Sequence, residues 1–221
     1  MENEQNNILT RRRLLQLLAI SSIGSAALPS QAFADIKSPS DIFDDIKKPI
    51  FVPENTGKKG KIGDGDISFK LNKSQTDGHV GITESTLPVG YLGAPPHYHK
   101  TFDEICRVTQ GVLTIMVGNE LFEVKAGDWH LRPRGIVHSF WNTGKETVKF
   151  IELYSPAGHE AYMSDLADLF INNQRPKPGD LDRLAKQYDI TFDWPRLKEI
   201  MDKYKVHLLY KYKKGLFQSH I

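Results

Sequence analysis

Three histidines and one glutamate near the middle of the chain have the spacing of a metal site. His97 and His99 are two positions apart, so a β-strand through them would point both imidazole rings to the same side. Glu104 follows after the tetrapeptide Lys-Thr-Phe-Asp, and we expect a bend there that returns its carboxylate toward the two rings. His138 comes just after a Pro-x-Gly turn, where a strand resumes. Together they offer a divalent ion three nitrogens and one carboxylate oxygen.

The stretches around these residues resemble the two signature motifs of the cupin superfamily. The first, over 97–111, follows the pattern H-x-H, four residues, Glu, six residues, Gly. The second matches at each of its fixed positions, which are Gly127, Pro133, Gly135, His138 and Asn142. The first motif departs at one position, because Tyr91 replaces the glycine expected six residues before the first histidine, with Gly90 and Gly93 beside it. The resemblance covers roughly 81–157 and leaves all four ligand positions intact.

The cupin pattern implies a specific metal site. It makes His97, His99, Glu104 and His138 the ligands of one divalent transition metal ion, for which iron, manganese, nickel, copper and zinc are all candidates. It also implies that Glu104 serves as the catalytic base. A strand through the last histidine directs Phe140 to the same face, so Phe140 should line a substrate pocket. We place Phe102 at the mouth of that pocket, although either ring could instead be a core residue.

The resemblance also implies an activity. The Ser-Pro-Ala-Gly-x-Glu stretch at 155–160 is similar to single-domain cupins related to quercetin dioxygenase. It implies a dioxygenase or oxidase, commonly a homodimer, that acts on a small chelating phenolic or hydroxy-keto substrate. Two alternatives stay open. One is a metal-dependent isomerase or ketonising enzyme that acts on sugars or uronates from polysaccharide breakdown, and the other is a non-catalytic cupin that binds a metal or a sugar.

The N-terminal part of the chain is predicted to direct export. Residues 1–34 combine a polar start, a modest apolar run and an Ala-Phe-Ala cleavage site. The Thr-Arg-Arg sequence at 10–12 resembles a twin-arginine signal, and an ordinary secretory signal is the alternative. Because the apolar run is too short to span a bilayer permanently, we expect a periplasmic or secreted protein without a stable membrane anchor. Residues 35–60 are polar and rich in proline and glycine, which predicts a linker.

The rest of the chain is predicted to be mainly β, with helices at its C-terminus. Short alternating runs between 61 and 157 are separated by turn residues, which indicates a closed sandwich or barrel. The cupin resemblance implies a double-stranded β-helix, or jelly roll. From 158 to 221 the apolar period becomes helical, and Asp180 is a plausible N-cap. This extension would either pack on the outside of the barrel or another subunit, or form a lid over the barrel mouth.

Composition limits the partners and the core. The 29 basic and 27 acidic residues give a net charge of +2, so we expect a small-molecule substrate and no nucleic acid. The single cysteine, Cys106, shares strand parity with the predicted ligand Glu104, so it should point into the barrel and cannot form an internal disulfide. Trp129, Trp141 and Met116 are predicted core residues.

Overall fold

The computed structural model describes residues 49–174, 176–177 and 179–209. The chain divides into two units, residues 1–50 and 51–221, and every element described below lies in the second unit. The predicted export segment, 1–34, lies outside the described residues. In the part of the chain that the structure describes, no helix has the length and apolar character needed to cross a membrane.

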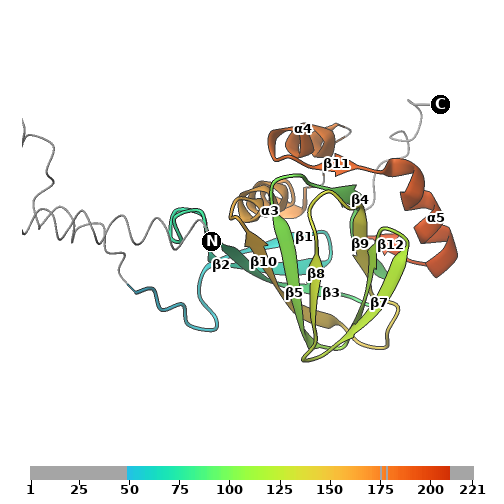
Figure 1. The fold of residues 1–221 in the computed structure, drawn as a ribbon, viewed down its shortest axis with the longest axis horizontal. Helices are drawn as coiled ribbons and strands as arrows, with labels where there is room; N and C mark the ends of the chain where they lie inside the picture. The colour runs from blue at the N-terminus through green and yellow to red at the C-terminus, as the bar shows by residue number, and fades with distance from the viewer. Residues whose placement is uncertain (1–48, 175, 178, 210–221) are drawn as a thin grey trace, which may run out of the picture. The chain divides into compact units, whose positions relative to one another are not determined.

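Two antiparallel sheets face each other and form a cupin-like jelly roll (Figure 1). The first sheet contains, in spatial order, β1 (Lys58–Ile62), β2 (Gly65–Leu71), β3 (Gly81–Leu87), β10 (Val148–Ser155), β5 (Asp103–Gln110) and β8 (Trp129–Arg132). The second contains β11 (Thr191–Phe192), β4 (Tyr91–Tyr98), β9 (His138–Trp141), β6 (Val112–Val117) and β7 (Glu120–Lys125), and β12 (His207–Leu208) pairs with β4 in parallel. The predicted fold class is confirmed.

Alternating side chains explain why these runs form strands around a core. In β10 every second residue is buried, beginning with Val148, and the residues between them are more exposed. The turn between β6 and β7 is a two-residue hairpin, with Val117 opposite Glu120, and Gly118 adopts φ +60 there. Gly90 adopts the left-handed conformation, with φ +82, immediately before β4. The entry turn of the first motif is therefore kept although Tyr91 replaces its glycine.

Among the described residues, three α-helices and one short 3₁₀ helix follow the barrel. They are α3 (His159–Asp168), the 3₁₀ helix η2 (Ile171–Asn173), α4 (Asp180–Gln187) and α5 (Trp194–Tyr204). Helix α3 packs against β1, β2 and β3 of the first sheet, whereas α5 packs against β4 of the second. Asp193 caps α5 by accepting a hydrogen bond from the backbone N–H of Arg196.

Several predictions of local structure need correction. The linker expected over 35–60 overlaps β1, a lysine-rich edge strand that pairs with β2. The helical extension also contributes two short strands, β11 and β12, to the second sheet. Helix α4 is capped by Gly179 in the left-handed region, and Asp180 is its first residue.

The core predictions hold except at one tryptophan. Trp141, Met116 and Cys106 are buried as predicted. Trp129 is 58% exposed, so its assignment to the core is wrong. The pairing of β8 with β5 turns Trp129 and Leu131 outward and the charged Arg132 inward.

Candidate metal centre and adjoining cavity

The four predicted ligands converge in the structure. One potential ligand atom from each of His97, His99, Glu104 and His138 lies within 4.8 Å of the others, and all four residues are buried. Such a cluster of three imidazoles and one carboxylate has the donor set of a single divalent transition metal ion. Sequence spacing therefore identified residues that the fold brings together.

Strand pairing and one turn position these side chains. His97 in β4 lies directly opposite His138 in β9, so the two rings approach with centroids 4.5 Å apart. His99 follows the end of β4, and its carbonyl accepts a 2.7 Å hydrogen bond from the backbone N–H of Gly135. The Pro-x-Gly turn of the second motif thus holds the loop of the first motif. Glu104, the second residue of β5, returns toward the rings as the predicted bend requires.

The backbone sets the orientation of two of the rings. The Nδ1 atom of His97 lies 2.8 Å from the Pro95 carbonyl, and that of His138 lies 2.9 Å from the Ile136 carbonyl. Donation from Nδ1 to a carbonyl leaves the Nε2 lone pair available to a metal. Burial lowers the pKa of both rings, which favours this neutral form.

Two buried nitrogens lack the partners that buried polar atoms usually have. Among the described residues, the Nε2 atoms of His99 and His138 have no hydrogen-bond partner. Each lies near the Glu104 carboxylate, at 3.5 Å and 3.6 Å. Unpaired buried nitrogens are costly, and a metal ion bound between the three rings and the carboxylate would satisfy them. The residues present therefore fit the metal that the pattern implies.

Arg132 controls the charge of the glutamate ligand. Its Nη1 atom lies 3.0 Å from Glu104 Oε2, and neither side chain is open to bulk water. Burial alone would raise the pKa of Glu104, but the guanidinium and the imidazoles around it hold that pKa well below its ordinary value. Glu104 is therefore ionised, as a metal ligand must be.

A second buried carboxylate shares the same arginine. Both oxygens of Glu152 lie 2.5 Å from Arg132 Nη2. Burial raises the pKa of Glu152 to about 7, although the arginine opposes this shift. The two carboxylates together raise the pKa of Arg132 despite its burial. Neither Arg132 nor Glu152 was predicted as a site residue.

His159 is a fourth imidazole at the site. It is the first residue of α3, it is buried, and its Nε2 atom lies 3.5 Å from Glu104 Oε1. The rings of Phe102, Tyr154 and Tyr162 surround it at centroid distances of 4.9, 4.7 and 5.1 Å. Burial lowers the pKa of His159 to about 3, so the ring is neutral. The sequence placed it in the Ser-Pro-Ala-Gly-x-Glu stretch but left its role unassigned.

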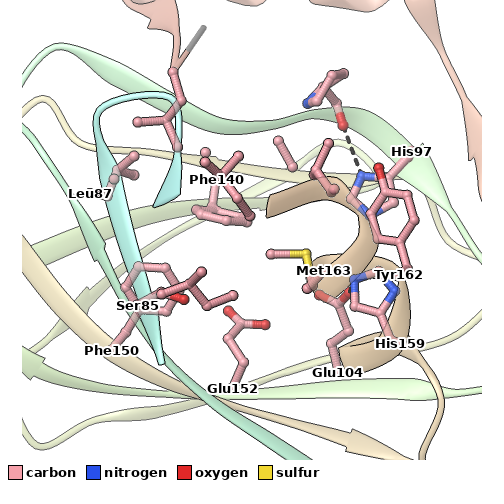
Figure 2. Close-up of a pocket in the computed structure, with 18 of the residues that line it drawn as sticks. Ser85, Leu87, His97, Glu104, Phe140, Phe150, Glu152, His159, Tyr162 and Met163 are labelled. Atoms are coloured by element: carbon pink, nitrogen blue, oxygen red, sulfur yellow. Dashed lines mark hydrogen bonds and ion pairs between the residues drawn. The ribbon is translucent and has the colours of Figure 1, made fainter. Parts of the chain in front are cut away.

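A cavity adjoins the cluster between the two sheets (Figure 2). His97 and Glu104 belong both to the cluster and to its lining, and Phe140 lines it as predicted. Phe102 does not line it. That ring is buried and stacks on His99, with centroids 3.7 Å apart and planes 13° apart, so it fixes the plane of a metal-facing imidazole.

The C-terminal extension forms part of the cavity wall. Helix α3 contributes His159, Tyr162, Met163 and Leu166 to the lining. Ile190 and Phe192, which lie at or next to β11, contribute two further apolar side chains. The extension therefore does more than pack on the outside of the barrel.

The fold and the site define a jelly-roll protein with a buried cluster of three histidines and one glutamate. Residues 83–154 match the family model of the cupin domain. Oxalate oxidase GF-3.8 from Triticum aestivum is 30% identical over 92 residues, which cover 38% of this chain and 41% of that protein. An uncharacterized protein from Aquifex aeolicus is 34% identical over 62 residues, 28% of this chain and 50% of that protein. The chain thus matches half or less of the length of these relatives.

Two of the similar solved structures each cover about half of the chain. KdgF from Halomonas sp. has a TM-score of 0.45 and 17% identity, covering 52% of this chain and 99% of that one. A predicted oxalate decarboxylase from Thermotoga maritima has a TM-score of 0.45 and 20% identity, covering 48% of this chain and 99% of that one.

Proposed function

We propose that this protein is a metal-dependent oxidoreductase, a dioxygenase or oxidase, that acts on a small chelating phenol or hydroxy-ketone. The observation that carries the proposal is that His97 and Glu104 of the cluster also line a cavity with mainly apolar walls. A divalent ion held by the four cluster residues would supply Lewis acidity and open coordination positions for two substrate oxygens.

The walls of the cavity favour a flat, apolar substrate. Phe140 and Phe150 face the cavity from opposite sheets, with ring centroids 5.6 Å apart, and Met163 lies beside them (Figure 2). Such side chains suit an aromatic ring and give a sugar few hydrogen-bond partners. The cavity volume of about 70 Å³ provides room for on the order of five water molecules. We therefore favour a single-ring substrate.

Glu104 is the base in this proposal. Its carboxylate faces the cavity beside the metal-facing imidazoles, so it is within reach of an acidic hydroxyl on a chelating substrate. Arg132 keeps the carboxylate ionised, and His159 Nε2 lies 3.5 Å from its other oxygen. Arg132 and the imidazoles already hold the pKa of Glu104 low, and a divalent ion held by the cluster would lower it further, so Glu104 would take a proton only from a hydroxyl made acidic by the same ion.

Metal content and oxygen uptake test the proposal. The full-length protein, recovered after expression in its natural compartment, should contain close to one transition metal ion per chain. His97→Ala and His138→Ala should each lose that metal, and His79→Ala, whose side chain is exposed and outside the cluster, should keep it. Metal that survives in both cluster variants would refute the site. Oxygen uptake with small chelating phenols then tests the activity, and its absence with every such substrate would refute the oxidoreductase.

A second candidate follows from the polar end of the cavity. Glu104 and Glu152 are two buried carboxylates of the cavity wall, and the neutral imidazole of His159 lies 3.5 Å from Glu104. Such groups could move protons between carbon and oxygen atoms of a substrate without using molecular oxygen. A metal-dependent isomerase or ketonising enzyme for sugars or uronates would use them. Turnover under strict exclusion of oxygen would favour this candidate over the first.

Location and assembly are also proposals. Export of the protein to the periplasm or outside the cell is supported by the Thr-Arg-Arg stretch, and unchanged export after replacing Arg11 and Arg12 by lysine would remove the twin-arginine route. A homodimer is supported by exposed apolar side chains on the edge strands β7 and β8, including Leu121, Trp129 and Leu131. Light scattering that gives the mass of one chain at micromolar concentration would refute it.

A further inference from the structure

We propose that Glu152 and Ser85 form a second polar subsite in the cavity, which binds a hydroxyl group of the ligand away from its metal-chelating atoms. The ligand is then a small ring with a chelating hydroxy-ketone or diol at one side and a hydrogen-bond donor at the other. This inference rests on the proposed function, because it places the chelating atoms at the histidine cluster.

The two residues continue a diagonal line that starts at the metal cluster. Strand β10 lies between β3 and β5 in the first sheet, so Glu152 on β10 lies between Ser85 on β3 and Glu104 on β5. In the strand registers Ser85 is opposite Phe150 and Glu104 is opposite Tyr154, each two residues from Glu152. Such diagonal neighbours are about 7–8 Å apart. Figure 2 shows the same succession of labelled side chains along the cavity.

Glu152 is an ionisable group among mainly apolar side chains of the wall. It is only 4% exposed, it lines the cavity, and its neighbours in the lining include Phe140, Phe150 and Met163. Arg132 binds both oxygens through a single nitrogen, Nη2. A carboxylate has about four acceptor positions, so Arg132 leaves capacity that a ligand hydroxyl can fill. Burial removes the water that would otherwise hydrate this carboxylate, and a ligand hydroxyl would take its place.

Ser85 offers a hydroxyl that the fold does not use. On the same face of β3, the Thr83 hydroxyl is already paired with the Tyr154 hydroxyl at 3.0 Å. The Ser85 side chain lines the cavity and has no hydrogen-bond partner among the residues that the structure describes. A serine hydroxyl can both donate and accept, so it can share a ligand hydroxyl with Glu152.

A matched pair of chelators tests the subsite. Kojic acid is a single-ring hydroxy-pyrone with a hydroxymethyl group across the ring from its chelating oxygens, and allomaltol is identical except that a methyl replaces that group. Full-length protein loaded with Co²⁺ under nitrogen would be titrated with each, and the visible spectrum of the cobalt would report chelation without turnover. We expect the wild-type protein to bind kojic acid about tenfold more tightly, because a hydrogen bond to a charged group contributes that much.

Variants of the two residues should reduce this preference without removing chelation. Glu152→Gln keeps the shape and an acceptor for Arg132, and we expect the affinity ratio to fall at least about threefold. Ser85→Ala, which removes one hydroxyl from the cavity wall, should lower the ratio about twofold to threefold and keeps the test valid if Glu152→Gln folds poorly. Glu84→Gln removes a charge from the outward-facing residue next to Ser85 and should leave the ratio unchanged.

The outcomes separate this inference from the proposed function. Equal affinities for the two pyrones in the wild-type protein, or a ratio that survives in both Glu152→Gln and Ser85→Ala, would overturn the subsite while chelation at the metal stands. If neither pyrone alters the cobalt spectrum, the cluster does not take a hydroxy-ketone, and both the proposed substrate class and the subsite are refuted.

Discussion

Arg132→Met should reveal how much the buried charges depend on one guanidinium. Arg132 is fully buried, contacts Glu104 at 3.0 Å and binds Glu152 at 2.5 Å. Methionine fills much of the same space but leaves two buried carboxylates without their cation. Removing one partner of a buried ion pair costs about 3–5 kcal/mol. For a chain of this size, that corresponds to a fall in Tm of about 6–20 °C.

The assay is thermal and urea unfolding of the full-length protein, followed by circular dichroism, with the metal removed by a chelator. Adding back a divalent ion should restore part of the lost stability, because the ion neutralises Glu104. The double variant Arg132→Met/Glu152→Gln should be more stable than the sum of the single effects predicts, with a coupling energy of at least about 1 kcal/mol. The effect of the added ion reports on Glu104, and the coupling energy of the double variant reports on Glu152.

A surface arginine provides the matched control. Arg134, two positions further along, pairs with Asp103 at 2.8 Å, but its side chain is 47% exposed. Arg134→Met should change the stability far less, because exposed ion pairs contribute little. If Arg132→Met lowers the free energy of unfolding of the metal-free protein by less than about 1 kcal/mol, the view that Arg132 compensates the buried charges is refuted.

Three further predictions concern other parts of the site. In the metal-free protein, the free energy of unfolding of the wild type, compared with that of Glu152→Gln, should decrease as the pH rises from 4.5 to about 7, because burial raises the folded-state pKa of Glu152 above its unfolded value. Urea unfolding that gives the same difference between the two proteins at every pH in this range would contradict the prediction. Gly93→Ala should cost about 1–3 kcal/mol, since a Cβ there would lie 2.0 Å from the Phe140 ring, and wild-type stability in urea would disprove this packing. The Cys106 thiol should resist aromatic disulfide reagents until the protein unfolds, because it is fully buried and burial raises its pKa; rapid labelling of the folded protein would show otherwise.

The four cluster residues could be predicted because short-range rules determine where they point. His97 and His99 are two positions apart at the end of a strand, so both rings point to the same side, and the turn before His138 is marked by proline and glycine. Their convergence needs only the pairing of β4 with β9 and the return of β5. Most of the strands were predictable for the same reason, since turn residues separate them.

Arg132 and Glu152 could not be predicted from composition, because charged residues are normally exposed. Their burial depends on β8 and β10 flanking β5, which brings an arginine and a glutamate together from distant parts of the chain. A usable signal existed for Glu152, which shares strand parity with the buried Phe150 and Tyr154. For Arg132 the parity was misleading, because the apolar Trp129 and Leu131 suggested the opposite face.

Short edge elements were hidden for a different reason. The sequence of β1 is Lys-Lys-Gly-Lys-Ile, which has low strand propensity and becomes a strand by pairing with β2. Strands β11 and β12 have two residues each, too few for any alternation to be recognised. Their pairing with β4 depends on how the helices before them pack.

The division of the cavity wall between two parts of the chain affects how such a protein can diverge. The cluster residues lie within 83–154, the segment that matches the family model of the cupin domain, whereas the wall formed by α3 and β11 lies after it. Substitutions at Met163, Leu166 or Phe192 can therefore reshape the cavity without changing the four residues of the buried cluster. Because Ser85, Phe140, Phe150 and Glu152 line the cavity from within the matched segment, exchanging the C-terminal segment would change one part of the wall and leave the rest of the wall and the cluster in place.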